Sequence, residues 1–210
     1  MKPLSILLFT LGICCIRPTA AQEPVSLAFS NQLDKESETV RLMAELLQIK
    51  AWEVLVTGKI AGLSYTLQTV HCINGKEQRS TPIAPQHVTS DTLRLLFFTQ
   101  PIGQDSVRIL IHTPQYKTAF GHTVQGAGDC ILLEPFPEKD QTTTDIIPVM
   151  AFSSGAPTKF NIGGETVSGI SFCRVRDSHL HPSKWHEQFK LKDYLYFEIK
   201  FTKPQRPENK

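Results

Sequence analysis

Apolar and polar residues alternate along most of this chain, a pattern that is typical of β-strands with one buried face. The clearest alternation is the one nearest the C-terminus, in which one face is formed by Leu195, Phe197, Ile199 and Phe201. Shorter alternations occur at 25–29, 54–56, 93–97 and 107–111. With further apolar runs elsewhere, they predict roughly ten short strands separated by turns rich in Pro and Gly.

Three turn signals divide these strands into hairpins. Asn74-Gly75 and Gly163-Gly164 each separate two predicted strands, and both dipeptides tolerate the positive φ angles of tight hairpin turns. A seven-residue loop at 100–106 joins the runs at 93–97 and 107–111. Residues 114–129 are expected to form a long, Gly-containing connection without regular structure.

One segment has the period of a helix. Between residues 37 and 50, Val40, Met43, Ala44 and Leu47 follow the i, i+3, i+4, i+7 spacing of a single helix face. We expect this amphipathic helix to pack against a sheet. Because alternating strand–helix units are absent, the predicted fold class is mainly β: an antiparallel β-sandwich-like domain with one N-terminal amphipathic α-helix.

The first 21 residues have the three-part layout of a secretory signal peptide. A basic start at Lys2 precedes an apolar run from Leu4 to Ile16, and Thr19-Ala20-Ala21 supplies small residues for cleavage after Ala21. The run is shorter than the ~20 apolar residues that span a bilayer, so no transmembrane segment is expected in the mature chain. We therefore predict a signal peptide at 1–21, a single β-rich domain at 22–203 and a flexible tail at 204–210.

The composition limits the cellular locations and the classes of partner that we expect. The chain carries 22 basic and 20 acidic residues, and removal of Lys2 and Arg17 with the leader makes the mature chain neutral. A neutral chain has no general attraction for nucleic acid. The mature chain also lacks Asn-x-Ser/Thr acceptor sites, which favours a bacterial source and a periplasmic or extracellular destination.

Three cysteines remain after the leader is removed: Cys72, Cys130 and Cys173. An odd number cannot pair completely within one chain. The sequence leaves two alternatives open, one disulfide with one buried thiol, or three reduced, buried thiols.

The histidines near the C-terminus are the candidate metal ligands. His179 and His181 point to the same side of an extended segment, and His186 could fold back after the following turn, with Asp177 or Glu187 adding a carboxylate. The alternative is that these histidines simply face solvent. No cofactor is otherwise indicated, and the one candidate is a divalent metal ion at His179, His181 and His186.

Aromatic residues suggest a second kind of site. Tyr194 and Tyr196 lie on the more polar face of the last strand, near Trp185. Exposed rings of this kind stack on sugars or peptides, or anchor a protein partner, and we predict a ligand-binding patch here. The alternative is that a loop or helix covers this face.

No catalytic residue is predicted. The Gly-rich segment 121–128 lacks the Lys of a phosphate-binding loop, because Ala127 stands in its place, and 152–155 lacks the first Gly of a serine-hydrolase elbow. Cys130 with His122 is the remaining nucleophile candidate, set against a buried structural Cys.

The sequence therefore favours an exported, non-catalytic binding module for a protein, peptide or glycan at the cell surface. One alternative is a metal-binding protein or metal-dependent hydrolase that uses the three histidines. Another is a structural subunit that joins a partner by strand addition through its first or last strand.

Overall fold

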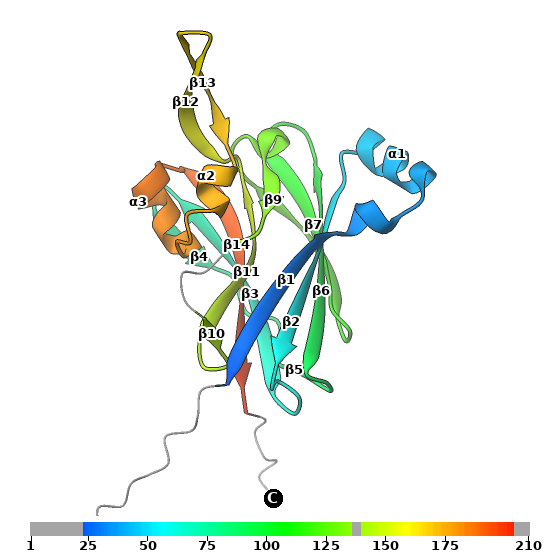
Figure 1. Cartoon of the computed structure of the whole chain (residues 1–210). Helices are drawn as coiled ribbons and strands as arrows, with labels where there is room; N and C mark the ends of the chain where they lie inside the picture. The colour runs from blue at the N-terminus through cyan, green and yellow to red at the C-terminus, as the bar shows by residue number, and fades with distance from the viewer. Residues whose placement is uncertain (1–22, 136–139, 204–210) are drawn as a thin grey trace, which may run out of the picture.

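The computed structural model describes residues 23–135 and 140–203, so the predicted signal peptide and tail lie outside the described residues. Most strands belong to two antiparallel sheets that face each other (Figure 1). Sheet A consists, in spatial order, of β10 (Gln141–Thr142), β1 (Pro24–Asn31), β2 (Lys50–Gly58), β6 (Thr92–Pro101), β7 (Ser106–His112) and β8 (Lys117–Thr123). Sheet B consists of β4 (Lys76–Arg79), β3 (Ser64–Ile73), β14 (Asp193–Thr202), β11 (Ile146–Ser153) and β9 (Ile131–Leu133), with β5 (Gln86–His87) also paired to β3. The prediction of a mainly β fold built from antiparallel sheets is confirmed.

The main core fills the space between the two sheets. The alternation in β14 directs Leu195, Phe197 and Ile199 into this core, and the Phe97 ring of β6 meets the Phe197 ring with centroids 5.0 Å apart. Burying each such side chain stabilises the fold by roughly 1.5–3 kcal/mol. The core therefore follows directly from the period-2 pattern of the sequence.

The predicted turns adopt the backbone conformations that their residues favour. Asn74 and Gly75 join β3 to β4 with φ of 50° and 79°. A Cβ on Gly75 would lie 2.5 Å from the His186 ring, so this position also requires Gly for space. Gly163 and Gly164, with φ of 60° and 90°, join β12 (Ala156–Ile162) to β13 (Glu165–Ser171).

A third layer covers the outer face of sheet B. It is formed by α2 (Cys173–Arg176), η3 (Pro182–Lys184) and α3 (Trp185–Phe189), which enclose a second apolar cluster against β3 and β14. Among the covering elements, α3 contributes the largest buried side chains of this cluster, Trp185 and Phe189. The second face of the last strand is therefore a second core, and not a solvent-facing surface.

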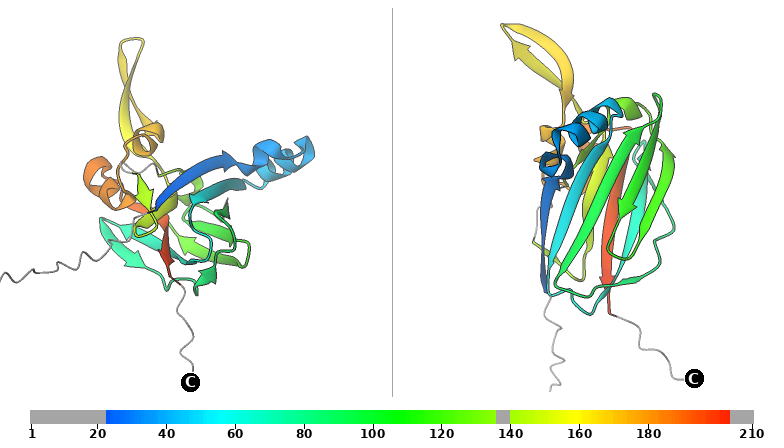
Figure 2. Two further views of the ribbon diagram at one scale, coloured as in Figure 1. Left: turned by 60° about the horizontal axis from the view of Figure 1, so that its bottom comes forward. Right: turned by 90° about the vertical axis from the view of Figure 1, so that its right-hand side faces the viewer.

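Two elements project from the sandwich rather than pack on it. The β12–β13 hairpin forms a separate two-stranded sheet, and α1 (Glu38–Leu46) extends sideways after η1 (Gln32–Lys35), as Figure 2 shows. Both lie towards the end of the sandwich opposite the point where β1 begins and β14 ends (Figure 1). We call this end the distal pole.

The helix within 37–50 does not pack across a sheet, so that prediction is wrong. Ser37 caps α1 by accepting a hydrogen bond from the Val40 N–H at 3.4 Å, yet Ala44 is the one buried residue of the helix. Leu46 is 83% exposed and Met43 is 57% exposed. The physical reason is that the inner face of sheet A is already filled by sheet B, and a short helix at the strand ends cannot reach it.

Three further findings revise or narrow the sequence predictions. The segment 114–129 contains the edge strand β8 and η2 (Ala127–Asp129), so the expectation of an irregular connection is wrong. All three cysteines are free thiols, with Cys72 and Cys130 buried and Cys173 exposed. Within the described ranges, no helix is both long and apolar enough to cross a bilayer.

Candidate functional site

The aromatic residues proposed as a ligand-binding patch are buried. Tyr194, Tyr196 and Trp185 are all 0% exposed, and the Trp185 and Tyr194 ring centroids lie 5.8 Å apart. The Tyr194 hydroxyl donates to the Pro182 carbonyl at 2.8 Å, and the Trp185 indole N–H donates to the Leu180 carbonyl at 3.2 Å. The prediction that these rings are exposed is wrong, because η3 and α3 fold over the tyrosines of β14 and bury Trp185 of α3 against them.

The three candidate metal ligands do not converge. His181 directs Nδ1 to the Ser183 hydroxyl at 2.9 Å, whereas His186 directs Nδ1 to the Leu191 carbonyl at 2.6 Å. His179 lies in a tight turn with φ of 57°. No group of three or more His, Cys, Asp or Glu side chains within 23–135 and 140–203 is arranged to hold a metal ion. The predicted His179–His181–His186 cluster is therefore wrong, since η3 and α3 turn the rings towards different neighbours.

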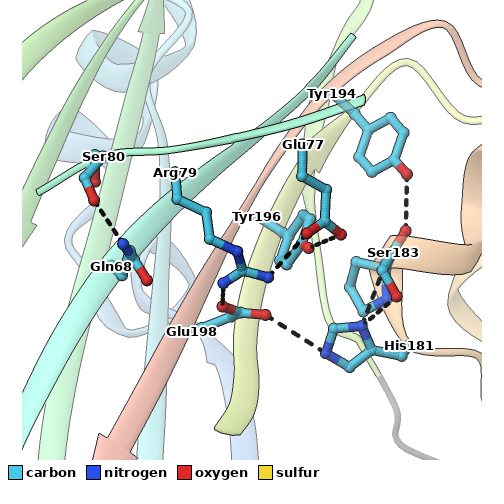
Figure 3. A network of polar contacts seen from close by, with 10 residues as sticks. Gln68, Glu77, Arg79, Ser80, His181, Ser183, Tyr194, Tyr196 and Glu198 are labelled. Atoms are coloured by element: carbon cyan, nitrogen blue, oxygen red, sulfur yellow. Dashed lines mark hydrogen bonds and ion pairs between the residues drawn. The ribbon is translucent and has the colours of Figure 1, made fainter. Parts of the chain in front are cut away.

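His181 instead joins a polar network on the outer face of sheet B (Figure 3). At its centre the Glu198 carboxylate, 3% exposed, forms an ion pair with the Arg79 guanidinium. Arg79 also pairs with Glu77 at 2.9 Å, and the Tyr196 hydroxyl donates to the Glu77 carboxylate at 2.6 Å. The His181 Nε2 atom lies 3.6 Å from Glu198.

The electrostatics of this network favour fixed charges. Burial works against ionisation of Glu77, but hydrogen bonds from Tyr196 and Arg79 outweigh it and hold the pKa of Glu77 below its ordinary value. The hydrogen bond with Glu198 raises the pKa of Arg79, and burial lowers the pKa of His181 although Glu198 opposes that effect. Because the carboxylates share one guanidinium, the arrangement stabilises paired ions and suits a structural role.

A second polar cluster joins His71 of β3 and Asp193 of β14, in sheet B, to His122 of β8, in sheet A. The His71 Nε2 atom lies 2.6 Å from Asp193, which also accepts the Gln125 N–H at 2.8 Å. The His122 ring meets the His71 ring edge-on, with centroids 5.1 Å apart. Burial lowers the pKa of His122, and the electrostatic interaction with His71 lowers it further. A cavity of about 190 Å³ adjoins these rings and is lined by Thr69, His71, Gln78, Arg79, Ser80 and His122.

Cys130 does not supply an activated thiolate to this cluster. Burial raises the pKa of Cys130 to about 12, so its thiol stays protonated at neutral pH. The Sγ atom lies 3.4 Å from the Gly126 carbonyl, to which it donates. This environment favours the structural interpretation of Cys130 over the nucleophile that the sequence left open.

The exposed apolar residues are concentrated at the distal pole. Nine of the eleven large apolar side chains that are exposed in the described ranges belong to α1, its C-cap or the hairpin. We call the first group the α1 apolar surface: Val40, Leu42, Met43, Leu46 and Leu47. The hairpin contributes Phe160, Ile162, Val167 and Ile170. Soluble monomers seldom expose so many neighbouring apolar residues unless these residues take part in an interaction.

The hairpin is amphipathic across its two faces. In the register Phe160 pairs with Val167 and Ile162 pairs with Glu165, and the two pairs share one face, on which Phe160, Ile162 and Val167 are apolar and Glu165 is charged. We call these three residues the hairpin apolar face. The Phe160 ring lies across Gly169, where a Cβ would be 2.8 Å from the ring. β12 and β13 pair with each other alone among the described strands, so both have an outer edge without a strand partner.

The α1 apolar surface continues onto the outer face of sheet A. A cavity of about 210 Å³ begins where α1 ends and is lined by Ile49, Phe98, Thr99, Gln100, Arg108 and Leu110. Phe98 pairs with Ala51 on one side and Leu110 on the other, which extends an apolar row across three strands. Comparison of the chain with known protein families, curated proteins and solved structures gives no match, so this surface is interpreted from its own geometry.

Proposed function

We propose that the protein is an exported, non-catalytic binding module whose partner is another protein, held at the distal pole. The observation that carries this proposal is the placement of nine of eleven exposed large apolar side chains in α1 and the hairpin. Apolar anchors on projecting elements are what a protein partner buries on binding. The predicted signal peptide at 1–21 supports export.

The structure's features favour a protein over the other partner classes. The rings on which a glycan site was predicted, Tyr194, Tyr196 and Trp185, are buried. A lipid bilayer would leave the open edges of β12 and β13 unsatisfied, because hydrocarbon offers no hydrogen-bond partner. A protein can cover both the apolar side chains and an open strand edge.

Strand addition is the second candidate function, and the hairpin is its favoured location. The last strand cannot serve as an edge, because β14 lies between β3 and β11, so that part of the prediction is wrong. The first strand pairs along its length with β2 and at Pro24 and Val25 with β10. Addition of a partner strand along β1 stays a prediction, whereas both hairpin strands offer an outer edge.

Site-specific photo-crosslinking in intact exporting cells tests the proposal. A photoreactive residue replaces Ile162 or Leu46 at the distal pole, or Ile146 as a matched exposed apolar control on β11. We expect discrete protein adducts from positions 162 and 46 and none from 146, and Phe160→Asn should abolish the adduct at 162. Absence of any adduct from both distal positions would refute the proposal.

A further inference from the structure

We propose that the partner at the distal pole is a second copy of this chain, with α1 of one copy packed on the hairpin apolar face of the next. This inference rests on the proposed function and specifies its partner. Each copy carries both halves of the contact: an amphipathic helix and an amphipathic hairpin, each with its apolar side exposed. The two halves belong to one chain but project in different directions (Figure 2).

Charge complementarity supports this pairing. The segment 36–47 carries Glu36, Glu38 and Glu45 against the single base Arg41. None of these three carboxylates forms an ion pair in the described residues. The acidic helix therefore has charges available for a basic partner surface.

Arg174 provides a basic group at the base of the hairpin. Arg174 reaches the Thr158 hydroxyl of β12 at 3.5 Å and lies over the Phe189 ring, and it takes part in no ion pair within the described residues. In the register Thr158 lies on the same face as Phe160, so Arg174 is the base that acidic residues of α1 can reach when its apolar side meets the hairpin apolar face.

The dimensions of the two elements also match. A helix of nine residues such as α1 is roughly 14 Å long. A strand of seven residues such as β12 extends over roughly 23 Å. The helix can therefore lie along the hairpin, over Phe160, Ile162 and Val167, without passing beyond its ends.

The contact joins two different surfaces, so it is head-to-tail. Two copies joined in this way keep a free α1 at one end of the pair and a free hairpin at the other. Assembly then continues from copy to copy, unless a ring closes. This property separates the proposal from a symmetric dimer in which two helices or two hairpins meet.

Light scattering coupled to size exclusion tests the proposal with the purified exported protein, from about 1 µM to about 1 mM. The wild type should increase in mass with concentration. Leu46→Glu and Ile162→Glu alter side chains that are 83% and 65% exposed, so both variants should fold. Each places a charge in the contact and should raise the Kd of self-association about tenfold or more. Ile146→Glu is the matched control and should assemble like the wild type.

Mixing the two variants gives the decisive measurement. Leu46→Glu retains an intact hairpin and Ile162→Glu retains an intact α1, so an equimolar mixture should form a dimer that stops at two copies. A mixture that stays monomeric while the wild type assembles would overturn the head-to-tail contact. A wild type that is monomeric at every concentration would overturn the second copy as partner, whereas adducts with a different protein in the crosslinking experiment would leave the proposed function standing.

Discussion

Glu198 shows how one charged residue organises the outer face of sheet B. Its carboxylate lies on a strand whose neighbouring side chains on that face are the buried rings of Tyr194 and Tyr196. Removing a buried carboxylate from water is costly, and the Arg79 ion pair offsets that cost. The pair also fixes β4 to β14 across β3, and it thereby supports the third layer.

The first prediction concerns the Arg79–Glu198 pair. Arg79→Met leaves Glu198 buried without its counter-ion, so the free energy of unfolding should fall by about 2–3 kcal/mol, less than for a fully buried pair because Arg79 is partly exposed. Urea denaturation measures the change. Lys59→Met, which removes an exposed ion pair with Glu23, is the control and should cost at most about 1 kcal/mol. Equal losses in the two variants would show that Arg79 acts only at the surface.

The second prediction is a pH dependence that arises from Glu53. A hydrogen bond from Lys35 is the largest cause that lowers the pKa of Glu53. Burial opposes it, but further hydrogen bonds from Arg94 and Ser30 also lower the pKa, which falls from 4.5 to about 2. A lowered carboxyl pKa in the folded state stabilises the protein above the unfolded pKa, and this contribution is lost as pH falls from about 5 to about 2.

Glu53→Gln tests this dependence. The variant should be about 1–2 kcal/mol less stable than the wild type at pH 7, allowing for the solvent exposure of Lys35 and Arg94. The difference should shrink as the pH falls and vanish near pH 2. Chemical denaturation at a series of pH values measures it, and a constant difference from pH 7 to pH 2 would contradict the assignment.

At the scale of elements, the sequence pattern specifies which residues share a face but not what covers that face. The alternation in β14 correctly separates the Phe197 side from the Tyr196 side. It cannot show that α3, which begins at Trp185, folds back over the second side. The same limit explains α1, because helical spacing identifies an apolar stripe whether or not a partner element is present.

The sequence pattern does not indicate the strand β8, and the reason differs from that for α1. Its inward residues include Phe120 and His122, and its outward residues include Ala119 and Gly121, so polar and apolar residues do not alternate cleanly. Gly and small residues are poor strand formers in isolation. Pairing with β7 over the whole length of β8 supplies the hydrogen bonds that make it a strand.

The third prediction concerns the junction between β11 and the hairpin. Gly155 has φ of 74°, and a Cβ there would lie 2.8 Å from both Ile170 and Phe172. Gly155→Ala should therefore lower the free energy of unfolding by about 2–4 kcal/mol through backbone strain and overpacking. Gly163→Ala is the control, since φ is 60° but no atom lies within 4 Å.

Calorimetry of the two variants separates the effects. Gly163→Ala should cost only about 1 kcal/mol, the strain of a positive φ alone. If Gly155→Ala proves no more costly than Gly163→Ala, then the hairpin can move at its base and the contacts of Ile170 and Phe172 do not fix it.

At the scale of the whole molecule, local patterns predict the mainly β, antiparallel architecture, but the polar clusters depend on tertiary contacts. His71, His122 and Asp193 come from β3, β8 and β14, and no spacing in the sequence connects them. The histidines at 179, 181 and 186 are close in sequence but are separated by the turns of η3 and α3. Proximity along the chain is therefore a poor guide to side-chain clusters in this fold.

The fourth prediction concerns the export of the full-length chain. If residues 1–21 form a cleaved signal peptide, N-terminal sequencing of the protein recovered from outside the cytoplasm should begin at Gln22. Replacing Ala21 with a bulky residue such as Leu should shift or block the cleavage. A product that keeps Met1 and stays with the cytoplasmic fraction would contradict the prediction.

The placement of the strand ends gives the molecule a built-in direction. β1 begins and β14 finishes on the side facing away from α1 and the hairpin (Figure 1). Any immobilising support or membrane anchor joined ahead of β1 or behind β14 would orient every copy alike, with Ile162 facing outward. A densely coated bead or cell would thus display α1 and the hairpin of every copy at its outer surface.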